Sequence, residues 1–395
     1  MDWKKKIPSL FVKDRKISHN YRLFKNLYNI NAPFSIYKNK RIINWSNNDY
    51  NGITQNPYIK RSLIFGINNL GCGSSGTRNI GGTNAVHAQL ESKVANLHSK
   101  ENGLIFNSGY QANFSCMETF GTLFPDAKIF SDEYNHNSII NGIKLSGLEK
   151  HIFKHNDMDS LESLLKREKS PKKIIAVESM YSIDGSITPF NDLLYLSKKY
   201  NALTFVDEIH AVGVHGKRGA GITEMLNIQD KIDIIMGGFG KGYGLVGGYL
   251  SGCRDLIDSI RLCGSGFIFT TSLPPHIVLG ILKSIDYNIE NIKENQDKRN
   301  KVIRYFKRQA LDKNIPLIEN NFKESQIQSI HIGCPLKSKK IHNLLLEHHN
   351  HYVQHLNYPT VSKGNERLRL SLKSFHNKKM IDDLLTKIEI LLYTI

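Results

Sequence analysis

A single lysine stands among glycines in the segment GGFGKG, where Lys241 comes shortly after the apolar run 234–236. Small neighbours let a ligand approach the backbone closely. A lysine that is kept from water, near another cation, has a lowered pKa and can form an imine with a carbonyl compound. A phosphate-binding loop of the GxxxxGK[ST] type is excluded, because Gly242 occupies the position of the required Ser or Thr. On this segment alone, a solvated loop lysine stays an alternative.

A carboxylate and an imidazole follow a second apolar run. Residues 203–206 lead into Asp207, and His210 follows in the same short segment, VDEIH. Ligands of open α/β sheets bind at the carboxyl ends of strands. A carboxylate there could hold a metal ion, act as a base or pair with a cationic ring nitrogen. Capping of the next helix is the plainer interpretation, and this segment by itself favours it.

Two further segments place polar side chains after apolar runs. In SDEYNHNS, His136 could stack its imidazole on a planar cofactor, although an isolated histidine is more often a hydrogen-bonded structural residue. In SMYSIDG, the pair Asp184 and Gly185 is a turn signal. Ser182, just before this turn, would project a hydroxyl into the same crevice.

Strand and helix patterns alternate between about residues 85 and 290. The apolar runs typical of buried strands are 103–106, 128–130, 173–177 and 203–206. The stretches with helical periodicity are 87–99, 158–167 and 191–200. This alternation predicts an α/β fold with a mostly parallel central sheet and helices on both faces. Because the carboxyl ends of parallel strands meet at one edge, the polar segments should converge there.

The two ends of the chain differ in character from this region. Residues 1–50 form a polar, partly helical N-terminal segment with one short strand signal, and residues 51–290 form the large domain. From 291 the chain becomes rich in Lys, Asn and Glu, with shorter strand signals and a final helix at 378–393. We therefore expect a smaller C-terminal α/β domain at 291–395.

Composition limits the possible partners. The 53 Lys and Arg against 36 Asp and Glu give a net charge of +17, which can indicate nucleic acid or an anionic membrane. The basic residues are scattered, and no nucleic-acid-binding motif accompanies them, so we expect no nucleic-acid partner. No run of about 18 apolar residues exists and the N-terminus resembles no signal peptide, so we expect neither membrane association nor secretion.

The five cysteines are Cys72, Cys116, Cys253, Cys263 and Cys334. Their number is odd and no CxxC pair occurs, so the sequence predicts reduced, buried thiols in a cytoplasmic protein. The same spacing gives no support for a metal site.

The order of the motifs is more specific than any one of them. Along the chain the motifs are Gly-Tyr at 109, Asn-His at 135, Ser-x-Asp-Gly at 182, Asp-x-x-His at 207 and Gly-Lys at 240. In this order they resemble the fold-type I pyridoxal-phosphate enzymes, and the resemblance extends from about residue 20 to 380. Within that class the chain is similar to the α-oxoamine synthases. The 5-aminolevulinate synthase branch is favoured by GTRNI at 76–80, GFIFTTSLPP at 266–275 and YVQHLNYPTV at 352–361.

The resemblance implies that pyridoxal 5'-phosphate is the cofactor and that the catalytic residues are Lys241, His136, Asp207 and His210. Lys241 would hold the cofactor as a Schiff base and later remove a proton from the substrate. Asp207 would pair with the ring nitrogen, His136 would stack on the ring, and Ser182 and His210 would bind its phenolate oxygen. The phosphate would lie by Gly109, Tyr110 and Gly238, with Thr270 and Thr271 contributed to the site of the other subunit in a homodimer.

The implied reaction is an acyl transfer. The enzyme would condense glycine with succinyl-CoA, release CoA and CO₂ and form 5-aminolevulinate, the first step of tetrapyrrole and haem biosynthesis. Arg369 would bind the glycine carboxylate, because its planar fork suits bidentate pairing. The other substrate residues implied by the resemblance are Asn48 for glycine, Arg22, Ser131, Lys150 and Thr360 for the acyl-CoA, and Thr77 and Asn79 for the distal succinyl carboxylate.

Three departures from the family pattern leave alternatives open. Gly238 stands where the family usually has a phosphate-binding Thr, Ser75 stands in a Gly-rich position, and Asn51 stands where Leu is usual. The tail 367–371 is nearer to the biotin-pathway relatives, and the run 371–374 lacks the Pro that is often found there. The alternatives are therefore another α-oxoamine synthase, such as an 8-amino-7-oxononanoate synthase, or a catalytically weakened paralogue.

Overall fold

The computed structural model describes residues 3–395, and the chain divides into two compact units. Unit 1 comprises residues 1–47, 183–185 and 297–395, and unit 2 comprises residues 48–182 and 186–296. The N-terminal segment thus belongs to the same unit as the C-terminal residues. The change of unit lies at residues 296 and 297, within the long helix α11 (Pro275–Asp312).

Unit 2 is built around a seven-stranded sheet with the order β4-β10-β9-β8-β7-β5-β6. The strands β5 to β9 run parallel, and β10 is antiparallel to both of its neighbours. The α/β fold with a mostly parallel sheet is therefore confirmed. The strands are β4 (Asn102–Phe106), β5 (Lys128–Asp132), β6 (Glu149–Phe153), β7 (Lys173–Glu178), β8 (Ala202–Asp207), β9 (Ile234–Gly238) and β10 (Gly248–Gly252).

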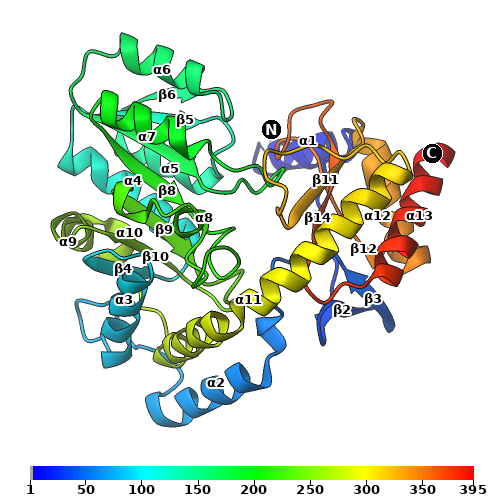
Figure 1. Cartoon of the computed structure of the whole chain (residues 1–395), viewed down its shortest axis with the longest axis horizontal. Coiled ribbons are helices and arrows are strands. Elements are labelled where there is room, and N and C mark those ends of the chain that lie inside the picture. Colours follow the sequence, from blue (N-terminus) through cyan, green and yellow to red (C-terminus); the bar gives the residue numbers. More distant parts are fainter. Residues whose placement is uncertain (1–2) are drawn as a thin grey trace. The chain divides into compact units, whose positions relative to one another are not determined.

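Helices of unit 2 alternate with these strands along the chain (Figure 1). The predicted helix at 158–167 coincides with α6, and the other two predicted helices differ from α3 and α7 by one or two residues. The helices are α2 (Pro57–Leu70), α3 (Ala85–Leu97), α4 (Gly109–Leu123), α5 (Asn137–Ser146), α6 (Met158–Arg167), α7 (Phe190–Lys199), α8 (Ile222–Met225), α9 (Arg254–Cys263) and α10 (Ser265–Ile268), with 3₁₀ turns η1 (Ile53–Gln55) and η2 (Gln229–Lys231).

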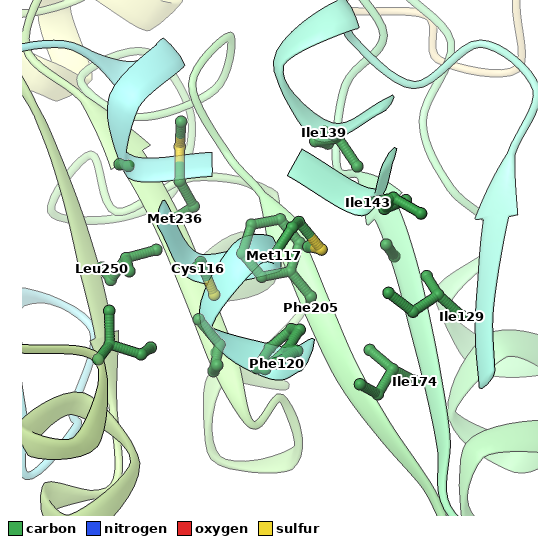
Figure 2. Close-up of a cluster of buried hydrophobic side chains, with 14 of the residues drawn as sticks. Cys116, Met117, Phe120, Ile129, Ile139, Ile143, Ile174, Phe205, Met236 and Leu250 are labelled. Carbon is green, nitrogen blue, oxygen red and sulfur yellow. The ribbon is translucent and has the colours of Figure 1, made fainter. Parts of the chain in front are cut away.

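The sheet is buried on both faces because successive residues of a strand point to opposite sides. In β4, Leu104 and Phe106 pack into the cluster that contains Met117 and Phe120 of α4, which Figure 2 shows. Ile105 between them packs into a second cluster, with α3 and α11. Both faces are thus covered by helices, and the polar residues at the strand ends are the ones that stay available for chemistry.

Unit 1 holds two small sheets, with the orders β1-β2-β3-β12 and β11-β14-β13. The first joins the two ends of the chain, because β3 pairs in parallel with β12. The elements are α1 (Trp3–Ile17), β1 (Tyr28–Asn29), β2 (Phe34–Tyr37), β3 (Lys40–Asn44), β11 (Ile327–His331), α12 (Pro335–His349), β12 (His351–Tyr352), β13 (Gln354–Leu356), β14 (Arg367–Ser371) and α13 (Lys378–Thr394). No helix within residues 3–395 is long and apolar enough to cross a bilayer.

The exposure of the cysteines differs from the burial that the sequence analysis predicted. All five are free thiols, but Cys72, Cys253 and Cys263 are exposed and only Cys116 is buried. The prediction of buried thiols was wrong for these three, because they lie in a loop and at the two ends of α9, where no second layer covers them.

Candidate active site

Lys241 is held in a chain of polar contacts just after β9. Its Nζ lies 2.7 Å from Nε2 of His210, and Nδ1 of His210 lies 2.8 Å from the hydroxyl of Tyr50. The Tyr50 hydroxyl donates to Oδ1 of Asn48 at 3.3 Å. His210 and Tyr50 are buried, so these contacts lie in a medium of low polarity, where a hydrogen bond orients its partners strongly. The lysine amine therefore has a defined position at the edge of the sheet.

Asp207, the last residue of β8, has a donor on each carboxylate oxygen. Oδ2 accepts from Nδ2 of Asn113 at 2.7 Å, and Oδ1 accepts from the backbone N–H of Ile209 at 2.8 Å. Asn113 lies on α4 and also donates to Oγ of Ser138. The side chain of Asp207 is 1% exposed, so these donors stabilise a buried charge and fix its direction.

His136 caps α5 beside these two residues. Its Nδ1 lies 2.7 Å from Oγ of Ser138. Although His136 is exposed, the protein around its imidazole desolvates the ring and lowers its pKa. The charge of Asp207 raises this pKa and that of Lys241 lowers it, so His136 lies within reach of both. The aromatic ring of Tyr110 approaches it edge-on, with centroids 6.2 Å apart.

Two glycines let Ile209 pack closely near the N-terminus of α4. This helix begins at Gly109, where unpaired backbone N–H groups favour an anion. A Cβ on Gly109 would lie 2.5 Å from Cδ1 of Ile209, and a Cβ on Gly238 would lie 2.5 Å from Cγ1 of the same residue. The absence of both side chains lets Ile209 pack against the backbone here, and Ile209 fills the place that a longer side chain at 238 would need.

The remaining cofactor residues from the sequence analysis also lie in unit 2. Ser182 begins the turn that comes after β7, and Tyr110 is the second residue of α4. Thr270 and Thr271 follow α10, where Asn107 donates to Oγ1 of Thr270 at 3.4 Å and to the carbonyl of Thr271. The structure therefore places these residues on loops and helix ends that adjoin the sheet.

The predicted substrate residues of unit 2 fall into separate places. Asn48 joins the Lys241 contacts through Tyr50. Thr77 pairs with Thr271 in an isolated β-bridge, and Asn79 is exposed in the same loop. Ser131 is buried near the carboxyl end of β5, whereas Lys150 is exposed near the amino end of β6.

Three predicted substrate residues lie in unit 1. Nη2 of Arg22 donates to Oγ1 of Thr360 at 3.2 Å. Both residues line a pocket together with Lys25, Lys339 and Tyr352. Arg369 lies on β14, and its Nη1 donates to Oγ of Ser371 at 3.3 Å.

The sequence analysis missed the residues that hold the others in place. Tyr50 contacts His210, Asn113 contacts Asp207, and Ser138 contacts both His136 and Asn113. Asn113 lies four positions after Gly109, and hence on the same face of helix α4, which the sequence analysis did not predict. Tyr50 carried no signal, since the contact spans 160 positions of the chain.

Comparisons with known proteins identify the family of the chain. The model of the family "Aminotransferase class I and II" matches residues 40–388. A 5-aminolevulinate synthase of Rickettsia prowazekii is 45% identical over 374 residues, which are 94% of this chain and 89% of that protein.

Two solved structures show the same fold. A serine palmitoyltransferase from S. paucimobilis matches with a TM-score of 0.91 over 100% of both chains, at 24% identity. An 8-amino-7-oxononanoate synthase from Francisella tularensis matches with a TM-score of 0.75 at 27% identity, over 89% of this chain and 97% of that one. Fold, site and sequence identity lead to one conclusion: the chain belongs to the class I and II aminotransferase family and, within it, to the 5-aminolevulinate synthases.

Proposed function

We propose that this protein is a pyridoxal-phosphate-dependent acyltransferase that condenses glycine with succinyl-CoA to give 5-aminolevulinate, CoA and CO₂. The observation that supports it most strongly is the 45% identity to a 5-aminolevulinate synthase over 94% of the chain. The product would enter tetrapyrrole and haem biosynthesis. The five free cysteines support a cytoplasmic location, because thiols stay reduced there.

The donor set of the site fits pyridoxal phosphate. An amine, a buried carboxylate and a histidine adjoin one another in unit 2, and the N-terminus of α4 offers an anion site. The residues that would hold the cofactor are Lys241 at its aldehyde, Asp207 at its ring nitrogen, His136 on its face, Ser182 and His210 at its phenolate oxygen, and Gly109 and Tyr110 at its phosphate, with Gly238 beside them. When bound, the cofactor supplies an aldehyde for an amine and a protonated ring that withdraws electrons from the reacting carbon.

The protein's own groups perform the proton transfers in this proposal. The Lys241 amine takes the α-proton of glycine, and its contact with Nε2 of His210 orients the amine. Asn113 and the Ile209 N–H fix the direction of the Asp207 carboxylate, which would pair with the ring nitrogen of the cofactor. Asn48 and Arg369 are assigned to glycine, and Thr270 and Thr271 to the phosphate in the site of the other subunit.

The acyl-CoA residues are assigned on the same basis. Arg22 and Thr360 line a pocket that Lys25 and Lys339 make basic, which suits a polyanionic thioester. Ser131 and Lys150 complete the acyl-CoA contacts in this proposal, and Thr77 and Asn79 bind the distal carboxylate.

A substrate panel tests the function. We expect the purified protein with pyridoxal phosphate to form 5-aminolevulinate from glycine and succinyl-CoA faster than any product from alanine or serine with other acyl-CoAs. Product formed only from alanine and a longer dicarboxylic thioester would replace the proposal with the 8-amino-7-oxononanoate synthase alternative, which the 27% identity of that fold neighbour keeps in view. No product with any pair would favour a catalytically weakened paralogue.

A homodimer is the proposed functional unit. Large apolar side chains remain exposed on either side of the Thr77–Thr271 bridge, with Ile80 81% and Phe269 80% exposed. Such side chains gain stability when a second copy covers them. We expect Phe269→Asp to shift the molar mass measured by light scattering from dimer to monomer and to reduce turnover. The control is Tyr195→Asp on α7, an exposed aromatic outside this region. A monomeric wild type would reject the homodimer, and a dimer that both variants leave unchanged would reject the surface around Phe269 as its interface.

A further inference from the structure

A second buried carboxyl group lies beside Asp207. Glu178 ends β7 as Asp207 ends β8, and the two residues are register partners in the parallel sheet. Residues Ile174 and Ala176 of β7 pack into the cluster that includes α4, so Glu178, two positions further, points to the same face. Both carboxyl side chains are 1% exposed.

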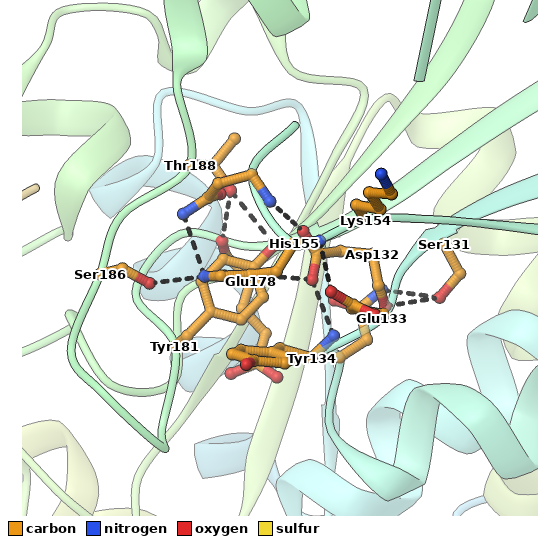
Figure 3. A network of polar contacts seen from close by, with 12 residues as sticks. Ser131, Asp132, Glu133, Tyr134, Lys154, His155, Glu178, Tyr181, Ser186 and Thr188 are labelled. Atoms are coloured by element: carbon orange, nitrogen blue, oxygen red, sulfur yellow. Dashed lines mark hydrogen bonds and ion pairs between the residues drawn. The ribbon is translucent and has the colours of Figure 1, made fainter. Parts of the chain in front are cut away.

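The two carboxyl groups differ in their partners. Asp207 has one donor on each oxygen. Glu178 accepts a hydrogen bond from the backbone N–H of His136, but its Oε1 is buried and has no hydrogen-bond partner within residues 3–395. The network around Asp132 and His155 lies nearby, and Figure 3 shows Glu178 within it. There the Asp132 carboxylate already accepts from the N–H groups of Tyr134 and Asn156 and contacts His155 Nδ1 at 2.9 Å.

Electrostatics decide which of the two groups carries a proton. Two adjacent buried carboxylates repel each other, and a buried carboxylate oxygen without a donor is costly. Burial raises the pKa of Glu178 well above its usual range, the charges of Asp207 and Asp132 raise it further, and the Lys241 cation and the His136 N–H oppose this. Because Asp207 has the better set of donors, the proton belongs on Glu178.

We propose that Glu178 is a positioning residue that stays a neutral carboxylic acid, holds the backbone of His136 and leaves Asp207 as the one anion of this pair. The proposal rests on the proposed function, since it assigns Asp207 to the cofactor's ring nitrogen and His136 to its face. A neutral neighbour lets the full charge of Asp207 act on the ring nitrogen, and the anchored His136 keeps its imidazole against the ring.

The replacement Glu178→Gln tests the protonation state. Glutamine is neutral and keeps an oxygen that accepts from His136. We expect this variant to fold. Its affinity for pyridoxal phosphate, measured by absorbance titration, should stay within about 2-fold of wild type, and so should its kcat at each pH. Glu178→Met keeps the neutrality but removes the acceptor, and we expect it to bind the cofactor at least about 5-fold more weakly. A Gln variant that fails to fold, or that shifts either limb of the profile by a full pH unit, would overturn the proposal.

Two measurements work without substrates. The infrared spectrum of the wild-type protein at neutral pH should contain the carbonyl band of a protonated carboxylic acid that is missing from Glu178→Gln. Glu149→Gln on the edge strand β6 removes an exposed glutamate that pairs with Lys128, and it should leave the band intact. A wild type without this band contradicts the proposal. If the substrate panel gives no 5-aminolevulinate while the band is present, only the assigned reaction fails and the protonation state of Glu178 stands.

The pH dependence of stability provides the second measurement. The pKa of Glu178 is higher in the folded than in the unfolded chain, so its contribution is fully present below the unfolded pKa and is lost as the pH rises toward the folded value. Glutamine cannot lose a proton. We therefore expect the Tm of Glu178→Gln minus that of wild type to increase with pH from about pH 4.5 upward, the ordinary range of glutamate ionisation. A constant difference would contradict the proposal.

Discussion

At the scale of single residues, the site depends on side chains that hold other side chains. Lys241 is placed by His210, which in turn contacts Tyr50, and Asp207 is placed by Asn113. Each of these supporting groups is buried and hydrogen-bonded, so it loses little freedom when a ligand binds. The reacting groups are therefore oriented before any substrate arrives.

Replacing Lys241 with Ala tests its assignment directly. The variant loses both the attachment point of the cofactor and the proposed base, so kcat should fall by roughly 10²-fold or more, the range for removing a positioned acid or base. Dialysis alone, without an added amine, should also remove pyridoxal phosphate from this variant. The absorbance of the cofactor measures its loss. Lys144→Ala on α5, an exposed lysine, is the control. Turnover retained in Lys241→Ala would overturn the mechanism.

Gly238 and Ile209 should behave as a coupled pair. A Cβ at 238 would lie 2.5 Å from Cγ1 of Ile209, so Gly238→Thr should lower the free energy of unfolding by about 1–3 kcal/mol, the usual cost of overpacking. Adding Ile209→Ala removes the clashing atoms, and urea unfolding of all four proteins gives the coupling energy. Strictly additive effects would show that the two positions do not compete for space.

At the scale of secondary structure elements, α4 combines several functions. Its N-terminus offers the anion site, Asn113 on the same helix reaches Asp207, and its outer side packs against α5. The close approach of α4 and α5 depends on glycine. A Cβ on Gly142 of α5 would lie 2.7 Å from Cβ of Met117 and 3.0 Å from the carbonyl oxygen of Phe114.

Gly142→Ala should therefore push α5 away from α4. We expect it to lower the free energy of unfolding by about 1–3 kcal/mol through overpacking, even though alanine favours helix formation by up to about 1 kcal/mol over glycine. Urea denaturation measures this change. Gly73→Ala is the matched control, because no atom lies within 4 Å of its added Cβ. Equal stability of the two variants would mean that the helices separate at no cost.

At the scale of the whole molecule, each unit contains histidines that resist protonation. Burial lowers the pKa of His98 in unit 2 and of His355 in unit 1 to about 3. His98 contacts the Tyr249 hydroxyl at 2.7 Å. The folded pKa is below the unfolded one, so the unfolded chain binds the proton first. The contribution of each histidine to the free energy of unfolding is complete above about pH 6.5, and it is lost as the pH falls toward the pKa of that histidine in the folded chain.

Acid sensitivity follows from these histidines. Each should reduce the free energy of unfolding by about 1.4 kcal/mol per pH unit below the unfolded pKa. His98→Gln removes one of these titrations, so its Tm should fall less steeply than that of wild type between about pH 6 and pH 4. The exposed His348 provides the control His348→Gln, which should keep the wild-type slope. A steeper fall in His98→Gln would contradict this explanation.

Periodicity and motif order were sufficient for much of the architecture. Helix α6 begins and ends where the pattern predicts. Strand β7 is one residue longer than its predicted run, and strand β8 is one residue longer at each end. These elements are defined by local alternation of apolar and polar residues, which the sequence displays directly. The antiparallel strand β10 and the parallel pairing of β3 with β12 were not predicted, because strand partners are chosen by contacts between distant residues.

The sequence by itself determined several of the strands and helices, the mostly parallel sheet, and the positions of Lys241, Asp207, His136 and Ser182 after strands, since each depends on its local neighbours. Only the tertiary structure decided which groups support them. Tyr50 reaches His210, Asn113 reaches Asp207, and Glu178 lies beside Asp207 because the sheet register brings the ends of β7 and β8 together. Hydrogen bonds and charge repulsion act over a few ångströms in space, and separation along the chain carries no information about that distance.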